Sequence, residues 1–206
     1  MTKFSVILLA LALLAGCSSE PTKSTVAEQP KPKGPELLTG RQAFQKMLIQ
    51  ARGWARDAQP YRLESQYNND SKGRDGKSAI WRASFASPSR GSVKPFVWSG
   101  TDASDAPSRG VSPGSEDTYN PSNSNTAIFD MAFMKVDSDQ AFEEAQKHGG
   151  DKVLDKNPDL PVFYVETWNP RANQLVWHVI YGNDPDSAKL RVAVDASTGS
   201  FLRIEK

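Results

Sequence analysis

The sequence is poor in the residues that most often carry chemistry. Its 206 residues include one cysteine and two histidines. A single cysteine excludes an internal disulfide, and two histidines leave little material for metal binding or acid–base catalysis. The chain also lacks a charge surplus, because 25 basic residues are balanced by 24 acidic ones. This balance argues against nucleic acid as a partner, since phosphate binding needs a basic excess.

Familiar catalytic patterns are missing as well. The chain contains no His-Glu-x-x-His, Cys-x-x-Cys, Gly-x-Ser-x-Gly or phosphate-loop pattern. We therefore predict no metal, no cofactor and no catalytic residue, and we expect that the protein is not an enzyme. The ordinary share of hydrophobic residues, 38%, nevertheless predicts a folded protein rather than a disordered one.

Residues 1–16 have the features of a secretory signal peptide. The apolar run from Phe4 to Ala15 follows Lys3, and as a helix it would rise about 18 Å, too short for a membrane core of about 30 Å. The run ends in Leu14-Ala15-Gly16-Cys17, which resembles the lipobox of bacterial lipoproteins. The resemblance implies cleavage between Gly16 and Cys17 and a diacylglyceryl group on the Cys17 thiol. The alternative is an ordinary secreted protein with an isolated cysteine.

A lipid on Cys17 would make the membrane the first partner of this protein. Several acyl chains, palmitate among them, give stable anchoring. Ser18 follows the anchor, whereas an aspartate there would resemble an inner-membrane retention signal. We therefore expect a location in the bacterial cell envelope, with the periplasmic face of the outer membrane favoured. Residues 17–38 contain four prolines and predict an extended, flexible tether.

The remainder predicts an α+β fold made of two similar halves, residues 39–99 and 128–206. Thr39 and Gln42 form a capping-box pattern before a helical apolar face, and Asp137 and Gln140 repeat it. We expect the second helix to end at Gly149-Gly150. Strand-like runs follow each helix, and Trp177 in the second half matches Trp81 in the first. Their predicted ranges are 61–67, 79–85 and 93–98, then 161–167, 175–181, 189–195 and 200–205.

Two connecting segments are harder to assign. Residues 100–127 are rich in Ser, Asp, Asn, Pro and Gly and predict a polar loop or linker. Residues 128–136 are apolar on both faces and predict a buried strand or extended segment.

The second half resembles a PepSY domain. The resemblance rests on Phe142-Glu143-Glu144-Ala145, on Leu175-Val176-Trp177-His178-Val179, and above all on Val194-Asp195-Ala196-Ser197-Thr198-Gly199. It implies a helix packed on an antiparallel sheet, and some family members bind or inhibit peptidases. In the turn, Asp195 can accept bonds from backbone amides and Gly199 permits a positive φ. Residues 39–99 resemble a degenerate second copy that lacks this turn.

Both histidines first suggest structural roles. His148 stands at the expected helix end, where an imidazole can bond free carbonyl oxygens. His178 alternates with Trp177, on the strand face of Val176 and Ile180, so a packed and hydrogen-bonded role is favoured. A spatial site built from a serine, His178 and Asp195 stays open, because sequence does not show which side chains meet.

Three functions remain open on the sequence alone. The first is a lipid-anchored, non-catalytic envelope protein that binds protein or peptide, with modulation of a peptidase as one form of this role; its binding face is unknown. The second is an envelope hydrolase that uses His178 with a nearby carboxylate, and the third is a structural spacer. Whether His178 lies under a helix or in an open pocket beside a carboxylate distinguishes the first two.

Overall fold

The computed structural model describes residues 34–182 and 185–205. The predicted signal peptide, Gly16, Cys17 and most of the predicted tether lie outside these residues. The folded part begins slightly earlier than expected, because Leu38 belongs to β1 (Leu38–Thr39), which pairs with β3 (Lys77–Ser78). In addition, the Glu36 amide donates to the Gly100 carbonyl at 2.9 Å.

A nine-stranded antiparallel sheet dominates the described residues and confirms the α+β class. The strand order is β11-β10-β9-β8-β2-β4-β5-β6, with β7 also pairing with β5. The strands are β2 (Gln59–Ser65), β4 (Ile80–Ser87), β5 (Ser92–Ser99), β6 (Gly110–Pro113), β7 (Asp117–Thr118), β8 (Val162–Asn169), β9 (Gln174–Tyr181), β10 (Leu190–Asp195) and β11 (Phe201–Glu205). Each of the seven predicted ranges that follow the two helices is present as a strand, with ends shifted by at most two residues.

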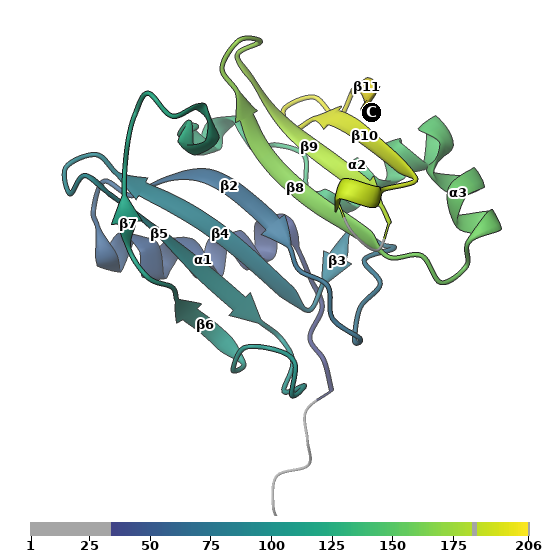
Figure 1. Ribbon diagram of the computed structural model, residues 1–206, viewed down its shortest axis with the longest axis horizontal. Coiled ribbons are helices and arrows are strands. Elements are labelled where there is room, and N and C mark those ends of the chain that lie inside the picture. Colours follow the sequence, from purple (N-terminus) through teal and green to yellow (C-terminus); the bar gives the residue numbers. More distant parts are fainter. Residues whose placement is uncertain (1–33, 183–184, 206) are drawn as a thin grey trace, which may run out of the picture. The chain divides into compact units, whose positions relative to one another are not determined.

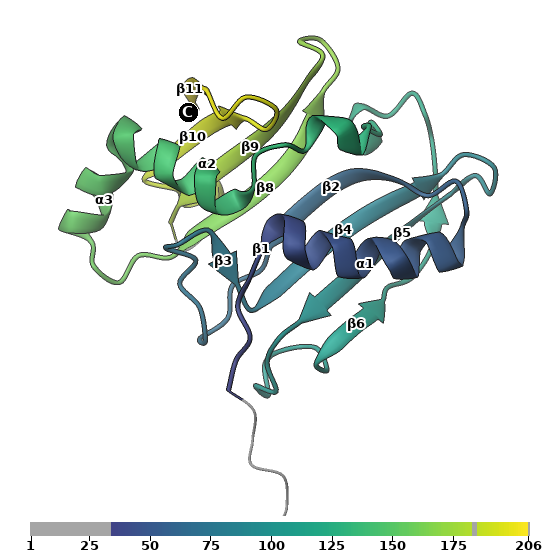
Figure 2. The same ribbon diagram turned by 180° about the vertical axis from the view of Figure 1, so that it is seen from behind.

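The α-helices lie on one face of this sheet. They are α1 (Gly40–Trp54), α2 (Ser138–Ala145) and α3 (Asp151–Lys156). Both predicted capping boxes are present, formed by Thr39 with Gln42 and by Asp137 with Gln140. Behind the sheet in Figure 1 and in front of it in Figure 2, α1 and α2 cover the same side. The opposite face carries none of the described α-helices.

The two halves are related as the sequence predicts. Their first strands, β2 and β8, pair antiparallel in the middle of the sheet, with Leu63 opposite Glu166. Trp81 and Trp177 occupy the second strand of each half, with ring centroids 6.4 Å apart. Each indole N–H donates to the carbonyl of the residue just before its half's helix cap, Leu38 at 2.8 Å and Val136 at 3.0 Å. Such equivalent bonds in equivalent places support an internal duplication.

The polar segment 100–127 differs from its prediction. It contributes β6 and β7, both paired with β5, and Val111 of β6 lies opposite Trp98. In the second half Phe201 of β11 lies next to Val194 in the same way. The prediction of a loop throughout was wrong because an outer strand is only partly buried and therefore needs few apolar residues. Thus β6 supplies the first half with a fourth strand equivalent to β11.

Two further predictions near the second helix had different outcomes. Residues 128–136 form no strand: they contain a 3-10 turn, η2 (Met131–Phe133), although Phe129, Met134 and Val136 are buried as expected. The helix ends where the sequence predicts, because His148 and Gly149 leave helical φ/ψ within η3 (Gln146–Gly150). Gly149 has φ 106°, and a separate helix, α3, begins after it.

The main core lies between the helices and the sheet. It includes the four alternating residues predicted to share one face of β9, all completely buried: Leu175, Trp177, Val179 and Tyr181. The expected cover by α2 is present, but α1 contributes too, because a Cβ on Gly40 would lie 2.7 Å from the Trp177 ring. The prediction that Trp177 belongs to the core is therefore confirmed.

One buried group in this core is ionisable. The Glu166 side chain is completely buried, and neither carboxyl oxygen has a hydrogen-bond partner among the described residues. Burial raises its pKa well above the usual range, nearby Asp137 adds to the increase, and Arg41 opposes it. Its surroundings therefore favour the protonated form of Glu166.

Candidate functional site

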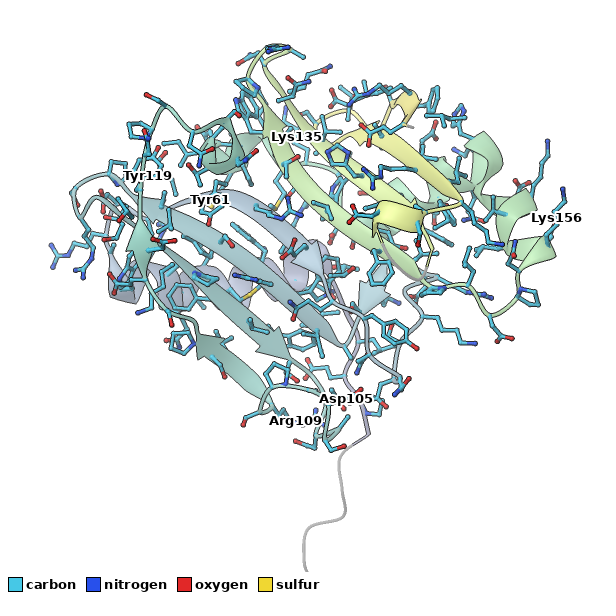
Figure 3. All side chains as sticks on the ribbon, in the orientation of Figure 1. Tyr61, Asp105, Arg109, Tyr119, Lys135 and Lys156 are labelled. Atoms are coloured by element: carbon cyan, nitrogen blue, oxygen red, sulfur yellow. The ribbon has the colours of Figure 1, made fainter. Side chains whose placement is uncertain are left out.

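A groove lies on the helix-free face of the sheet. Its volume is about 720 Å³, and its walls come from β2, β8, β9, β10 and β11 together with Asp186. Figure 3 shows side chains projecting from the strands on this face, which is turned towards the viewer, while α1 and α2 lie behind the sheet. The groove mixes apolar residues with charged ones, and His178 is part of its wall. Of the two positions considered from the sequence, under a helix or in the open, His178 therefore occupies the open one.

His178 joins two neighbours through both ring nitrogens. Its Nδ1 lies 2.7 Å from Oε2 of Glu205, and its Nε2 lies 3.1 Å from Oγ1 of Thr167. Strand register explains this meeting: Val165 is directly opposite His178, so Thr167 stands two residues along β8 on the same face. With Glu205 accepting from Nδ1–H, Nε2 of a neutral imidazole accepts the Thr167 hydroxyl proton.

The carboxylate of Glu205 is held from two sides. Its Oε1 accepts from Arg203 at 2.5 Å while Oε2 faces His178. Burial acts to raise the pKa of Glu205, but the His178 bond and the Arg203 charge outweigh it, so the pKa is lowered. Glu205 is therefore charged at neutral pH and is fixed as the partner of Nδ1.

The other side of Thr167 faces Arg62 of β2. These two residues are register partners in the β2–β8 pair. The Arg62 Nε donates to Glu64 Oε2 at 2.6 Å, and the Arg62 side chain is 41% exposed. The guanidinium is thus fixed at one nitrogen while the rest of it reaches the groove.

Apolar side chains form the floor next to His178. Val165 is opposite His178 on β8, and Phe163 is opposite Ile180. Val165, Phe163 and Ile180 all line the groove. A ligand in the groove would therefore meet a polar cluster beside an apolar surface.

His148, His178 and Asp195, which were candidate site residues in the sequence, lie in different places in the structure. His148 lies at the helix end within η3, with Nε2 3.2 Å from Glu144 Oε1 and its ring stacked on Phe201 at 3.7 Å. Asp195 accepts from the amides of Ser197 and Thr198, and Gly199 has φ 77°, which confirms the predicted turn. The carboxylate beside His178 is instead Glu205.

Sequence reasoning missed Thr167, Glu205 and Arg62. Alternation along residues 161–167 puts Thr167 on the face opposite Tyr164 and Glu166, but a threonine on a strand is unremarkable. Glu205 reaches His178 only through the order β9-β10-β11, which the sequence does not contain. The one sequence feature that pointed to this groove is His178, an isolated histidine on the strand face opposite Trp177.

Two other kinds of feature are absent from residues 34–182 and 185–205. No three or more His, Cys, Asp or Glu side chains come together there as a set that could hold a metal ion. None of the helices within the same ranges has the length and apolar character needed to span a membrane.

Comparison with known proteins gives little beyond the fold. No family model matches the chain, and no curated protein matches it either. A crystal structure described as that of a candidate lipoprotein from Clostridium difficile 630 is similar, with a TM-score of 0.52 and 11% identity. The match covers 79% of this chain and 91% of that one. At this identity the likeness shows a shared fold, and the PepSY resemblance remains a prediction.

Proposed function

We propose that this protein is anchored in the bacterial envelope by a lipid on Cys17 and binds protein or peptide through its folded part. The Leu14-Ala15-Gly16-Cys17 pattern supports the anchor, and the periplasmic face of the outer membrane is the favoured site because Ser18 follows it. The structural neighbour is itself described as a candidate lipoprotein. The PepSY-like pattern supports a peptide-binding role, including modulation of a peptidase.

One observation carries the binding role: the open groove of mixed character across the middle of the sheet. Its charges are matched within the groove, since Arg62 pairs with Glu64 and Arg203 pairs with Glu205. Because the positive and negative charges of the groove are paired with one another, the groove does not favour strongly charged ligands. An extended peptide, which is uncharged along its backbone and varied in its side chains, suits such a surface better than an isolated anion.

Peptide display tests the binding role. The described residues all belong to one compact unit, so a soluble fragment starting at residue 34 is suitable. We expect it to enrich a restricted set of peptides and expect Val165→Glu, a charge placed in the groove, to abolish the enrichment. Ile49→Glu is the matched control, because Ile49 is 72% exposed and lies on α1. Equal enrichment by wild type and Val165→Glu would refute binding in the groove.

A hydrolase is the second candidate, favoured by one specific observation. His178 lies in an open groove with Glu205 at 2.7 Å, which is the arrangement that a histidine base oriented by a carboxylate requires. Loss of a measurable hydrolytic turnover in His178→Gln, with the fold intact, would support this candidate.

A further inference from the structure

We propose that Thr167 is a nucleophile, activated by His178 and Glu205, that accepts an acyl group from carboxylic esters. This inference rests on the second function proposed above and not on peptide binding or on the lipid anchor. It adds the reacting atom, the group that stabilises charge, and the class of substrate.

The first support is the linear order of the three groups. Thr167 Oγ1, the two nitrogens of His178 and Glu205 Oε2 follow one another at 3.1 and 2.7 Å. A hydroxyl on a histidine that is oriented by a carboxylate is the general arrangement of an activated nucleophile. The three side chains come from β8, β9 and β11 of one sheet, so their spacing is set by rigid elements rather than by loops.

The second support is that the carboxylate of Glu205 is itself held in place. Arg203 fixes Glu205 from the side away from His178. The exposed fractions of the His178 and Glu205 side chains are 21% and 14%, so water competes only weakly for their bond. Thr167 remains at the groove wall, where a substrate can reach it.

The third support concerns the negative charge that develops on the carbonyl oxygen. Backbone N–H groups in the middle of a paired strand are used in the sheet and are poor donors for this purpose. Arg62, the register partner of Thr167 on β2, supplies a guanidinium on the same face. Glu64 accepts from its Nε at 2.6 Å, and Arg62 also lines the groove, so a guanidinium is present on this face that can stabilise an oxyanion.

The surrounding side chains indicate the substrate class. Phe163, Val165 and Ile180 form the apolar floor next to the cluster. They suit an apolar acyl chain, so esters of short aliphatic acids are the expected substrates. Uncharged esters also suit a groove whose arginines are already paired.

The reaction balances with water as the only co-reactant. The Thr167 oxygen attacks the carbonyl carbon while His178 Nε2 takes its proton, and Arg62 stabilises the oxyanion. The bond to the alkoxy group then breaks, and that oxygen leaves with the proton from His178. Water, losing a proton to His178, next attacks the acyl-threonine, and Thr167 regains a proton as the carboxylic acid departs.

The test is acylation of the full-length chain in detergent micelles by p-nitrophenyl butyrate, with mass spectrometry to locate the label. We expect a butyryl group on Thr167 and none there in Thr167→Val. We expect His178→Gln to slow labelling by about 100-fold and Arg62→Gln to slow it as well. Thr167→Ser should restore or increase it, because a primary hydroxyl is less hindered. Circular dichroism of each variant separates loss of chemistry from loss of fold.

Two results would overturn the proposal. One is labelling of Thr167 no faster in the folded protein than in urea. The other is a label on His178 itself that persists in Thr167→Val, which would mean that the imidazole reacts directly. Either result leaves the peptide-display experiment unaffected, so the two functions fail independently.

Discussion

At the scale of single residues, the chain places its two unusual side chains on opposite faces of one sheet. Glu166 is buried without hydrogen bonds under the helices, whereas His178 stands in the open groove with two partners. They are close in register, because Glu166 is opposite Trp177, the neighbour of His178. Because side chains alternate between the two faces of a strand, Glu166 lies in the core, whereas His178 lies in the groove.

Glu166 leads to a pH-dependent prediction. Its pKa is higher in the folded chain than its ordinary 4.5, so the folded state holds the proton more tightly than the unfolded state does. The free energy of unfolding therefore decreases as pH rises above about 4.5. We expect Glu166→Gln to be more stable than wild type at pH 7, because glutamine carries no proton-linked charge.

Urea unfolding at several pH values measures this effect. The gain of Glu166→Gln over wild type should shrink towards pH 4, where the carboxyl is protonated in both states. Glu143→Gln is a control with an exposed carboxyl. A gain that is the same at pH 4 and pH 7 would disprove the pH linkage of Glu166.

The proposed anchor depends on a single residue outside the described part, Cys17. We expect Cys17→Ser to abolish incorporation of labelled palmitate and to leave an uncleaved or unanchored chain, because serine lacks the thiol that is modified. Metabolic labelling followed by electrophoresis measures this. Label that still enters the Cys17→Ser chain would rule out a lipoprotein.

At the scale of elements, the two faces of β9 differ: one face, with Trp177, belongs to the core, and the other face, with His178, lines the groove. The Trp177 indole is completely buried and donates to the Val136 carbonyl at 3.0 Å. Truncating a large buried side chain typically costs about 3–5 kcal/mol. We expect Trp177→Ala to lower the melting temperature of a fragment starting at residue 34 markedly, and His178→Ala to lower it much less.

Differential scanning calorimetry of both variants checks this prediction. The fragment must include Leu38, because its carbonyl accepts from the Trp81 indole. Should Trp177→Ala melt at the wild-type temperature, the β9 face under the helices contributes little to stability, contrary to its complete burial.

The turn between α2 and α3 depends on a glycine. Gly149 has φ 106°, a conformation that costs about 1–2 kcal/mol for other residues, and a Cβ there would meet only Leu190 at 3.7 Å. We therefore expect Gly149→Ala to lower stability by about 1 kcal/mol through backbone strain alone. Gly53→Ala on α1, with open space around it, should be neutral or stabilising. Chemical denaturation of the pair measures the contrast.

Sequence patterns predicted the helices and strands that have one buried face and one exposed face. The caps at Thr39 and Asp137 and the alternation around Trp177 were sufficient, because each is a local pattern. They failed for β6, whose polar composition hides an outer strand, and for residues 128–136, which contain a 3-10 turn rather than a strand. The groove could not be predicted, since Glu205 meets His178 only through the strand order.

At the scale of the whole described unit, the two halves share one core. Trp81 and Trp177 contact across the middle, and Gly40 of the first half lies against the Trp177 ring. The two helix starts are joined as well, since Asp137 accepts from the Thr39 hydroxyl at 2.6 Å and from the Arg41 amide at 2.9 Å. Damage to one half should therefore reach the other.

Hydrogen exchange tests this coupling. We expect Trp81→Ala to increase amide exchange in β9 and β10 as well as in β4, because it removes part of the common core. Val93→Ala, near the outer side of β5, serves as a control that should act mainly within the first half. Exchange in Trp81→Ala that rises only in the first half would show two independent folding units.

The pairing of β2 with β8 has a consequence for how the protein holds together. Three antiparallel register pairs join the halves, and the antiparallel pairing of equivalent strands is also a way in which two identical subunits can form a symmetric dimer. Here the two halves belong to one chain. The segment that connects them gives each half an effective concentration near the other of about the millimolar range. Covalent linkage thus makes the association of the halves independent of dilution. The two halves also contribute different residues to the groove, His178 from the second half and Arg62 from the first.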